Sequence, residues 1–259
     1  MIKFFRKIRY DLMEQNKTGK YFKYAIGEIA LVVIGILIAL TINNWNTSRI
    51  NNDLERFYIQ GIIHDIETDV VRLSTNISLD SQKVASGNYL LNHFKNPTLK
   101  KDSIILFHFG NLLPGSHFQQ NNIMFEDMKF SGRLNIISNN SLRNNIQRYY
   151  DYGLRITEVL EGNSNYALEF FVSHIFSDEF DMNSILNEFS SSYAKSERMV
   201  EVNSFDSQLF YKSQNDPTIK KFINRISINI LLAQLNVKTL KTGRNNANEL
   251  TNELKYYLK

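Results

Sequence analysis

An uninterrupted apolar segment near the N-terminus constrains this chain more than any other feature of its sequence. Residues 24–45 read YAIGEIALVVIGILIALTINNW, and Glu28 is the only charged residue between Ala25 and Ile42. At about 1.5 Å per residue, a helix over this segment is roughly 31 Å long, which matches the hydrocarbon core of a bilayer. Aromatic residues suited to the membrane interface stand at both ends, namely Tyr21, Tyr24 and Trp45. We therefore predict a transmembrane helix over residues 24–45, with the lipid bilayer as a partner.

A cleavable signal peptide is the alternative interpretation of the same segment. Its basic N-terminal region would have to include residues 1–23, which is long for a signal peptide. Ala39-Leu40-Thr41 is also a poor match to the small-x-small pattern of a cleavage site. Both features favour an uncleaved anchor.

Positive charge is concentrated immediately before the apolar segment. Residues 1–23 carry seven basic and two acidic side chains, a net charge of +5, whereas the rest of the chain has a net charge of −1. Because basic residues are retained on the cytoplasmic side, we predict a cytoplasmic arm over residues 1–23 and place residues 46–259 outside the cytoplasm. Apolar residues recur at helical spacing in the arm, so it is either an amphipathic helix on anionic lipid or a plain topology signal. With the excess charge confined to this arm, we expect no nucleic-acid partner.

Two features of the apolar segment could serve association. Gly27, Leu31, Gly35 and Ala39 fall four residues apart and form a narrow, mostly small stripe, which allows two membrane helices to approach closely. Glu28 lies beside them, where its carboxylate either reaches the lipid headgroups or pairs with a group of another chain. The segment therefore predicts self-association, and an inner-membrane partner protein is a second option.

The remaining sequence is typical of long helices. Apolar residues recur at three- and four-residue spacing over residues 59–94, 142–174 and 219–257, which is the pattern of helices that pack together. Asn96-Pro97 ends the first stretch and Asp216-Pro217 begins the last. The chain has three prolines and no cysteine, which disfavours a many-turned β-fold and excludes a disulfide framework. We predict an all-α chain: one N-terminal transmembrane helix, followed by an elongated antiparallel helical bundle outside the membrane.

Known catalytic and metal-binding motifs are missing from the sequence. It has no glycine-rich phosphate loop, no HExxH, no GxSxG and no Glu-x-x-His pair. His64, Asp65, Glu67 and Asp69 form one acidic cluster, which we interpret as a solvated helix surface rather than a metal site. We therefore expect no cofactor, no bound metal and no enzymatic activity, while catalysis by acid and hydroxyl groups outside any known motif stays open.

A few polar or aromatic residues within the helical stretches could have a special role. Asn163 interrupts an apolar seam, so it either fixes helix register or lies exposed near a bend. Tyr149 and Tyr150 are expected to pack in the core with their hydroxyl groups hydrogen-bonded. The alternative is a ligand pocket lined by Phe130, Arg143, Tyr150 and their neighbours.

Two blocks of the sequence resemble a known protein family. The first is FFRKIRYDLMEQNKTGKYFKYAIGEIALVVIGILIALTINNWN, and the second is MKFSGRLNIISNNSLRNNIQRYYDY, residues 128–152. Both are similar to the uncharacterised DUF6090 family of membrane proteins from Bacteroidota. The resemblance implies a single-pass protein of the inner membrane with most of its chain in the periplasm. It implies no activity.

These observations favour a membrane-anchored periplasmic scaffold or interaction protein that acts in a homo-oligomer or a larger inner-membrane complex. The alternative is a periplasmic small-molecule sensor module, because helical bundles can bind ligands between their helices. The cytoplasmic arm of about 23 residues is too short for a signalling domain, so such a sensor would signal through a partner protein.

Overall fold

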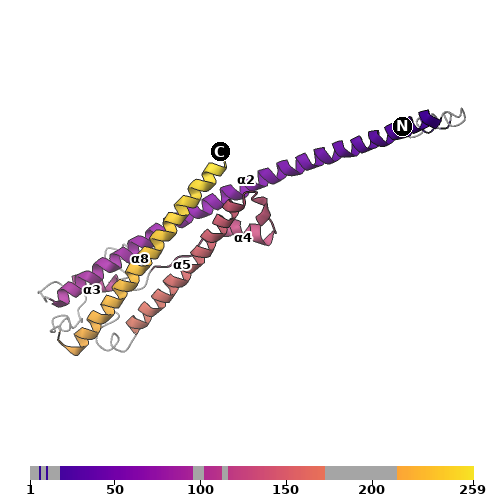
Figure 1. The fold of residues 1–259 in the computed structure, drawn as a ribbon. Coiled ribbons are helices and arrows are strands. Elements are labelled where there is room, and N and C mark those ends of the chain that lie inside the picture. Colours follow the sequence, from indigo (N-terminus) through magenta and orange to yellow (C-terminus); the bar gives the residue numbers. More distant parts are fainter. Residues whose placement is uncertain (1–5, 7–9, 11–17, 96–101, 113–115, 173–214) are drawn as a thin grey trace. The chain divides into compact units, whose positions relative to one another are not determined.

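The computed structural model of the chain describes residues 6, 10, 18–95, 102–112, 116–172 and 215–259 (Figure 1). Every regular element within these residues is a helix. The elements are α2 (Thr18–Lys95), α3 (Asp102–Gly110), α4 (Ile123–Phe130), the 3-10 helix η1 (Leu134–Ile136), α5 (Asn140–Val172) and α8 (Pro217–Tyr257). The prediction of an all-α chain with one long apolar N-terminal helix is confirmed for the described residues.

Local sequence explains where the helices begin and end. The side chain of Asp216 accepts a hydrogen bond from the Thr218 amide at 2.8 Å, and Pro217 occupies the first helical position of α8. Asn139 accepts one from the Leu142 amide at 3.1 Å at the start of α5. α2 is described as far as Lys95, and the Asn96-Pro97 pair expected to end it lies outside the described residues. The start of α8 expected from Asp216-Pro217 is therefore present.

The chain divides into two compact units, Met1–Phe57 and Tyr58–Lys259. In the first unit, the large apolar side chains of α2 between Ile26 and Ile42 are 46–64% exposed. None of the most apolar 18-residue window of this helix is buried. A helix that is apolar on all sides needs an apolar environment. By length and composition, α2 therefore contains one candidate membrane span near the N-terminus.

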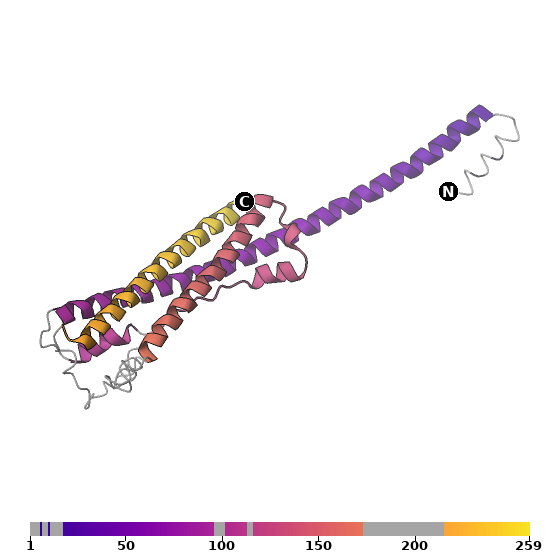
Figure 2. The same ribbon diagram turned by 60° about the horizontal axis from the view of Figure 1, so that its bottom comes forward.

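The second unit packs residues 58–95 of α2 with α5 and α8, and the two views of the ribbon agree on this arrangement (Figures 1 and 2). Asn145 of α5 donates to Glu253 of α8 at 3.0 Å, and Asn163 donates to Asn236 at 2.7 Å. Since the residue number rises along α5 as it falls along α8, these two helices run in opposite directions.

The interior of the second unit is an apolar cluster to which each long helix contributes. Its buried members are Leu73 and Ile77 of α2, Ile156 and Leu160 of α5, Leu240 of α8 and Phe118 from the segment before α4. Gly243 lets α8 approach α5, because a Cβ atom there would collide with Ile156. Burial of each large apolar side chain stabilises the fold by about 1.5–3 kcal/mol.

α3 closes one end of this unit through aromatic contacts. Phe109 of α3 meets Phe94 of α2 and Phe222 of α8, in both cases edge to face with ring centroids 6.4 Å apart. Such pairs add about 0.5–1.5 kcal/mol to the burial of the rings. All three rings are buried, so this end of the unit has a core of its own.

Candidate functional site

The residues that the sequence assigns to the membrane lie on the surface of α2. Tyr24 and Trp45 are 53% and 67% exposed, and Ala39 is exposed as well. Gly27 and Gly35 face open space, since a Cβ atom at either position would meet nothing within 4 Å. Glu28 is half-buried. The side chain of Tyr21 is not among the side chains that the structure describes. The small residues therefore leave one face of this helix free for close approach by another helix.

Polar groups near the end of the apolar segment are satisfied within the helix itself. The Thr41 hydroxyl donates to the carbonyl of Leu37 at 2.8 Å, which removes an unpaired polar group from the apolar surface. The guanidinium of Arg49 lies 6.0 Å from the ring centre of Trp45. A cation beside an aromatic ring at this position suits the headgroup region of a bilayer.

Four polar side chains of α2 in the second unit form a buried row, Asp65, Asp69, Asn76 and Asp80, which we call the α2 polar row. They are between 0 and 6% exposed. The interpretation of the acidic cluster as a solvated surface is therefore wrong for Asp65 and Asp69, although His64 and Glu67 are exposed. The reason is tertiary: residues 116–124, distant in sequence, cover these carboxylates and supply their hydrogen bonds.

The α2 polar row holds a segment that has no regular structure of its own. Asp69 accepts from the Asn121 amide at 2.8 Å, and Asp65 accepts from the Met124 amide at 3.0 Å, in the first turn of α4. Asn76 exchanges two hydrogen bonds with the backbone of His117, at 2.9 and 3.1 Å. Because buried amides need partners, these side chains replace the backbone pairing that a strand would provide.

Burial changes the acidity of this cluster. It raises the pKa of Asp69 to about 6, against the lowering effects of the hydrogen bonds from Asn121 and Tyr149. It also raises the pKa of Asp65. The pKa of Tyr149 is raised, first by burial and then by the charge of Asp69, whose Oδ2 accepts a hydrogen bond from the tyrosine hydroxyl at 2.7 Å. Asp69 is therefore a buried carboxyl that titrates near neutral pH.

A second polar group lies around Ser86 of α2. His108 Nδ1 lies 3.1 Å from Ser86 Oγ, and Asn111 donates to the same oxygen at 3.0 Å. The ring of Tyr89 stacks on His108 with centroids 3.9 Å apart. A serine beside a histidine can be a nucleophile, but Ser86 is only 3% exposed and its oxygen already accepts a hydrogen bond from Asn111. This pair therefore joins α2 to α3 and offers no access to a substrate.

The residues considered for a ligand pocket have separate environments. Phe130 is 88% exposed at the end of α4. Arg143 donates to Asn140 at 2.7 Å, within the first turn of α5. Tyr150 is buried and stacks on Phe125 with ring centroids 4.2 Å apart. The hydroxyl of Tyr149 has a partner as expected, whereas the Tyr150 hydroxyl has none among the described residues.

Asn163 has a partner that the sequence did not reveal. Its side chain donates to Asn236 Oδ1 at 2.7 Å, and Asn236 is 4% exposed. A bond between two amides in an otherwise apolar seam favours one alignment of α5 with α8, because any shift leaves both amides unpaired. This contact supports the register-fixing interpretation of Asn163.

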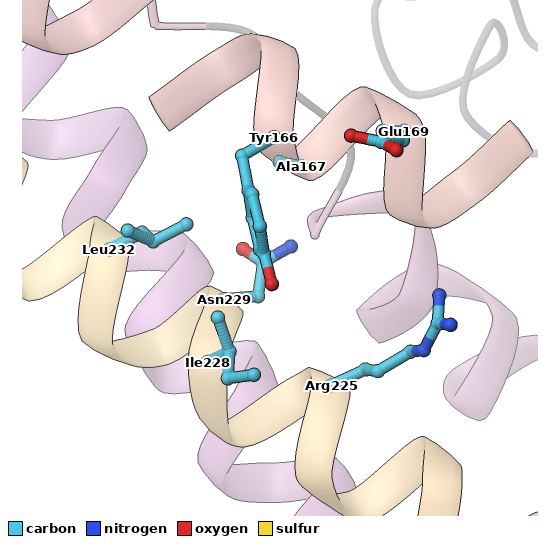
Figure 3. A pocket seen from close by; sticks show the side chains of 7 residues that line it. All are labelled: Tyr166, Ala167, Glu169, Arg225, Ile228, Asn229 and Leu232. Carbon is cyan, nitrogen blue, oxygen red and sulfur yellow. The ribbon is translucent and has the colours of Figure 1, made fainter. Parts of the chain in front are cut away.

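A pocket of about 260 Å³ lies between the end of α5 and the first half of α8 (Figure 3). Its lining residues are Tyr166, Ala167 and Glu169 of α5 and Arg225, Ile228, Asn229 and Leu232 of α8. Glu169 and Arg225 lie on one side of the Tyr166 ring, and Leu232 lies on the other (Figure 3). The pocket therefore combines a charged side with an apolar side. Sequence reasoning missed it, because it depends on how two distant helices are aligned.

Fold and surface together define an all-helical protein with one candidate membrane span. The model of a family of unknown function, DUF6090, matches residues 28–206, which is more than half of the chain. The chain therefore belongs to the DUF6090 family, and the resemblance seen in the sequence is confirmed. No curated protein and no solved structure matches the chain.

Proposed function

We propose that this protein is a membrane-anchored helical scaffold or interaction protein. In this proposal, α2 crosses the inner membrane once, residues 1–23 stay in the cytoplasm, and the second unit forms an antiparallel bundle in the periplasm. The protein acts as a homo-oligomer or within a larger inner-membrane complex, and it catalyses no reaction.

The observation that carries the proposal is the exposed apolar surface of α2 in the first unit. Eleven large apolar residues between Ile26 and Ile42 are each about half exposed or more. In water such a surface costs roughly 25 cal/mol for each Å² left uncovered, whereas lipid covers it without cost. The open face at Gly27 and Gly35 supports association of this helix with a second one.

Topology is tested by a reporter that is active only outside the cytoplasm, fused after Lys259. We expect activity from the wild-type fusion. Changing basic residues of the arm to Glu, Lys20 and Lys23 among them, should reduce it, because the retention signal is lost. A matched control changes Lys255 and Lys259 to Glu, which alters charge far from the anchor. An inactive wild-type fusion would overturn the topology and with it the proposal.

The interaction role is tested by native mass spectrometry after extraction in a mild detergent. We expect a second copy of the chain or another membrane protein at a fixed ratio. A strictly monomeric protein without any partner, at the concentrations found in the membrane, would contradict the scaffold role while leaving the anchor intact.

The pocket between α5 and α8 favours a second candidate function, a small-molecule sensor that signals through a partner. Its volume of about 260 Å³ lies just below the roughly 300–1,000 Å³ typical of ligand pockets, which suits a small metabolite. Native mass spectrometry would then find a metabolite at a fixed ratio. Ile228→Trp, which fills the pocket, should remove that metabolite, whereas Val71→Trp on the exposed surface of α2 should retain it.

A further inference from the structure

Exposed apolar side chains line the outer side of α5 and α8 in two stripes. Val159 and Tyr166 lie seven residues apart on α5 and are 40% and 53% exposed. Ile228, Leu231 and Leu235 follow a three-four spacing on α8 and are 39–53% exposed. Residues at these spacings share one face of a helix. Two stripes of this kind on packed helices have the pattern of a seam that is covered by further helices.

The two stripes lie next to each other. α5 and α8 are side by side in both ribbon views (Figures 1 and 2). Tyr166 of one stripe and Ile228 of the other line the same pocket (Figure 3). We call the surface formed by Val159, Tyr166, Ile228, Leu231 and Leu235 the α5/α8 face. A half-exposed aromatic ring beside a hollow is a common centre of binding energy in protein interfaces.

Gly162 lies between Val159 and Tyr166 and is not packed against any described part of the chain. A Cβ atom there would meet nothing within 4 Å. In contrast, Gly87, Gly153 and Gly243 each have a side chain of another element in the space that their own Cβ would need. A glycine within a helix costs about 1 kcal/mol relative to alanine. Its position in the stripe is explained if another helix approaches there.

The charges along these two helices are complementary. Residues 151–169 of α5 contain four acidic residues and one basic residue, whereas residues 230–248 of α8, which lie level with them, contain three basic residues and no acidic ones. The signs reverse at the other end, where Arg143 and Arg148 of α5 lie level with Glu249 and Glu253 of α8. A two-fold axis parallel to the helices, running through the face, places α5 of one copy on α8 of the other at the same level. Opposite charges then meet along the whole face.

We propose that two copies of this chain associate through the α5/α8 face. The apolar residues of the face span about 18 Å along the helices, and two packed helices are about 20 Å wide. The apolar part of the face is therefore roughly 360 Å² on each partner, about half of the ~800 Å² typical of a stable complex. The inference therefore rests on the proposed function in one respect: anchoring in a shared membrane raises the effective concentration of the copies enough for a modest interface.

Charge exchange between two variants of the full chain in nanodiscs tests the proposal. The first variant carries Lys238→Glu and Lys241→Glu on α8, and the second carries Glu158→Lys and Glu169→Lys on α5; all four positions are exposed. Each variant alone should associate at least tenfold more weakly than the wild type, because its α5 and α8 then carry like charges. The two variants mixed should associate as the wild type does. A mixture no better than either variant alone would overturn the proposal.

A second pair of variants tests the apolar stripes. Leu231→Glu with Leu235→Glu should weaken association tenfold or more without changing the thermal midpoint by more than a few degrees. Val71→Glu, at a 66% exposed position of α2, is the matched control and should associate normally. If the stripe variant unfolds at lower temperature but keeps its oligomeric state, the face is covered by residues of the same chain. A wild type that is anchored yet monomeric would likewise end this inference and leave the membrane anchor standing.

Discussion

The hydroxyl of Tyr149 lies 2.7 Å from Oδ2 of Asp69, a residue 80 positions earlier in the sequence. The other oxygen of the same carboxylate accepts the amide of Asn121. One buried side chain of α2 therefore joins α5 and the segment before α4. Because the side chains of Tyr149 and Asp69 are both buried, neither can exchange its partner for water. The hydrogen bond between them should therefore have a measurable effect on stability.

Tyr149→Phe should lower the free energy of unfolding by about 1–3 kcal/mol, because it leaves a buried carboxylate oxygen without its donor. Unfolding by denaturant, followed by circular dichroism in detergent, measures the change. Tyr166→Phe removes a hydroxyl from an exposed tyrosine of the same helix and should change stability by less than about 0.5 kcal/mol. Equal effects of the two substitutions would contradict the role assigned to this hydrogen bond.

Stability should depend on pH near neutrality through Asp69. Folding raises the pKa of this carboxyl from 3.8 to about 6, so the folded chain binds the proton more tightly than the unfolded one. Its contribution to stability is fully present below about pH 4 and is lost as the pH rises through 6, by about 3 kcal/mol in total. Asp69→Asn removes the titrating group. Subtracting the stability of this variant from that of the wild type, between pH 4 and 7.5, should reveal the decline, and a flat difference would refute it.

The amide pair between α5 and α8 should contribute to both stability and alignment. Asn163→Ala leaves the buried amide of Asn236 without its partner and should cost about 1–2 kcal/mol. Asn165→Ala, two residues away at an exposed position, is the control and should be nearly neutral. Replacing Asn163 and Asn236 together by Leu should restore stability but allow more than one alignment, which would broaden the amide spectrum in NMR. Sharp, single resonances in the double variant would argue against a role in register.

Association through the membrane helix should depend on the small face of α2. Gly35→Leu places a bulky side chain where the surface is open, so insertion should survive while association weakens. Ile34→Leu, on the neighbouring face, is the matched control. Glu28→Gln should have little effect if the carboxylate reaches the headgroups and a larger one if it pairs with a second chain. Oligomer size in nanodiscs is the measurement. If Gly35→Leu leaves the oligomer unchanged, the helix anchors the protein but does not contribute to association.

Features that depend on neighbouring residues could be predicted from the sequence. The start of α8 follows from an aspartate and a proline that are adjacent in the chain, and the candidate span follows from composition alone. In each case the physical cause lies within a few residues of the feature.

Features that depend on distant contacts could not be predicted. The sequence shows acidic residues on a helix, but it does not show that residues 116–124 cover Asp65 and Asp69, so the cluster was interpreted as solvated. One signal was present: positions 65, 69, 76 and 80 are spaced by four and seven, which keeps polar side chains on one face of the helix. The sequence shows no partner for Asn163, because its pairing with Asn236, 73 positions later, depends on how α5 and α8 are aligned.

The α2 polar row also has an evolutionary consequence. The amides of His117, Asn121 and Met124 are satisfied by side chains of α2, so the position of their segment depends on the residues of that helix. A backbone amide is the same for every residue except proline. The exposed side chains of the segment can therefore be substituted without loss of these hydrogen bonds. A substitution at Asp65, Asp69 or Asn76, in contrast, leaves backbone amides of the segment without their partners. In this part of the chain, selection should act on the helix that holds the loop more strongly than on the loop itself.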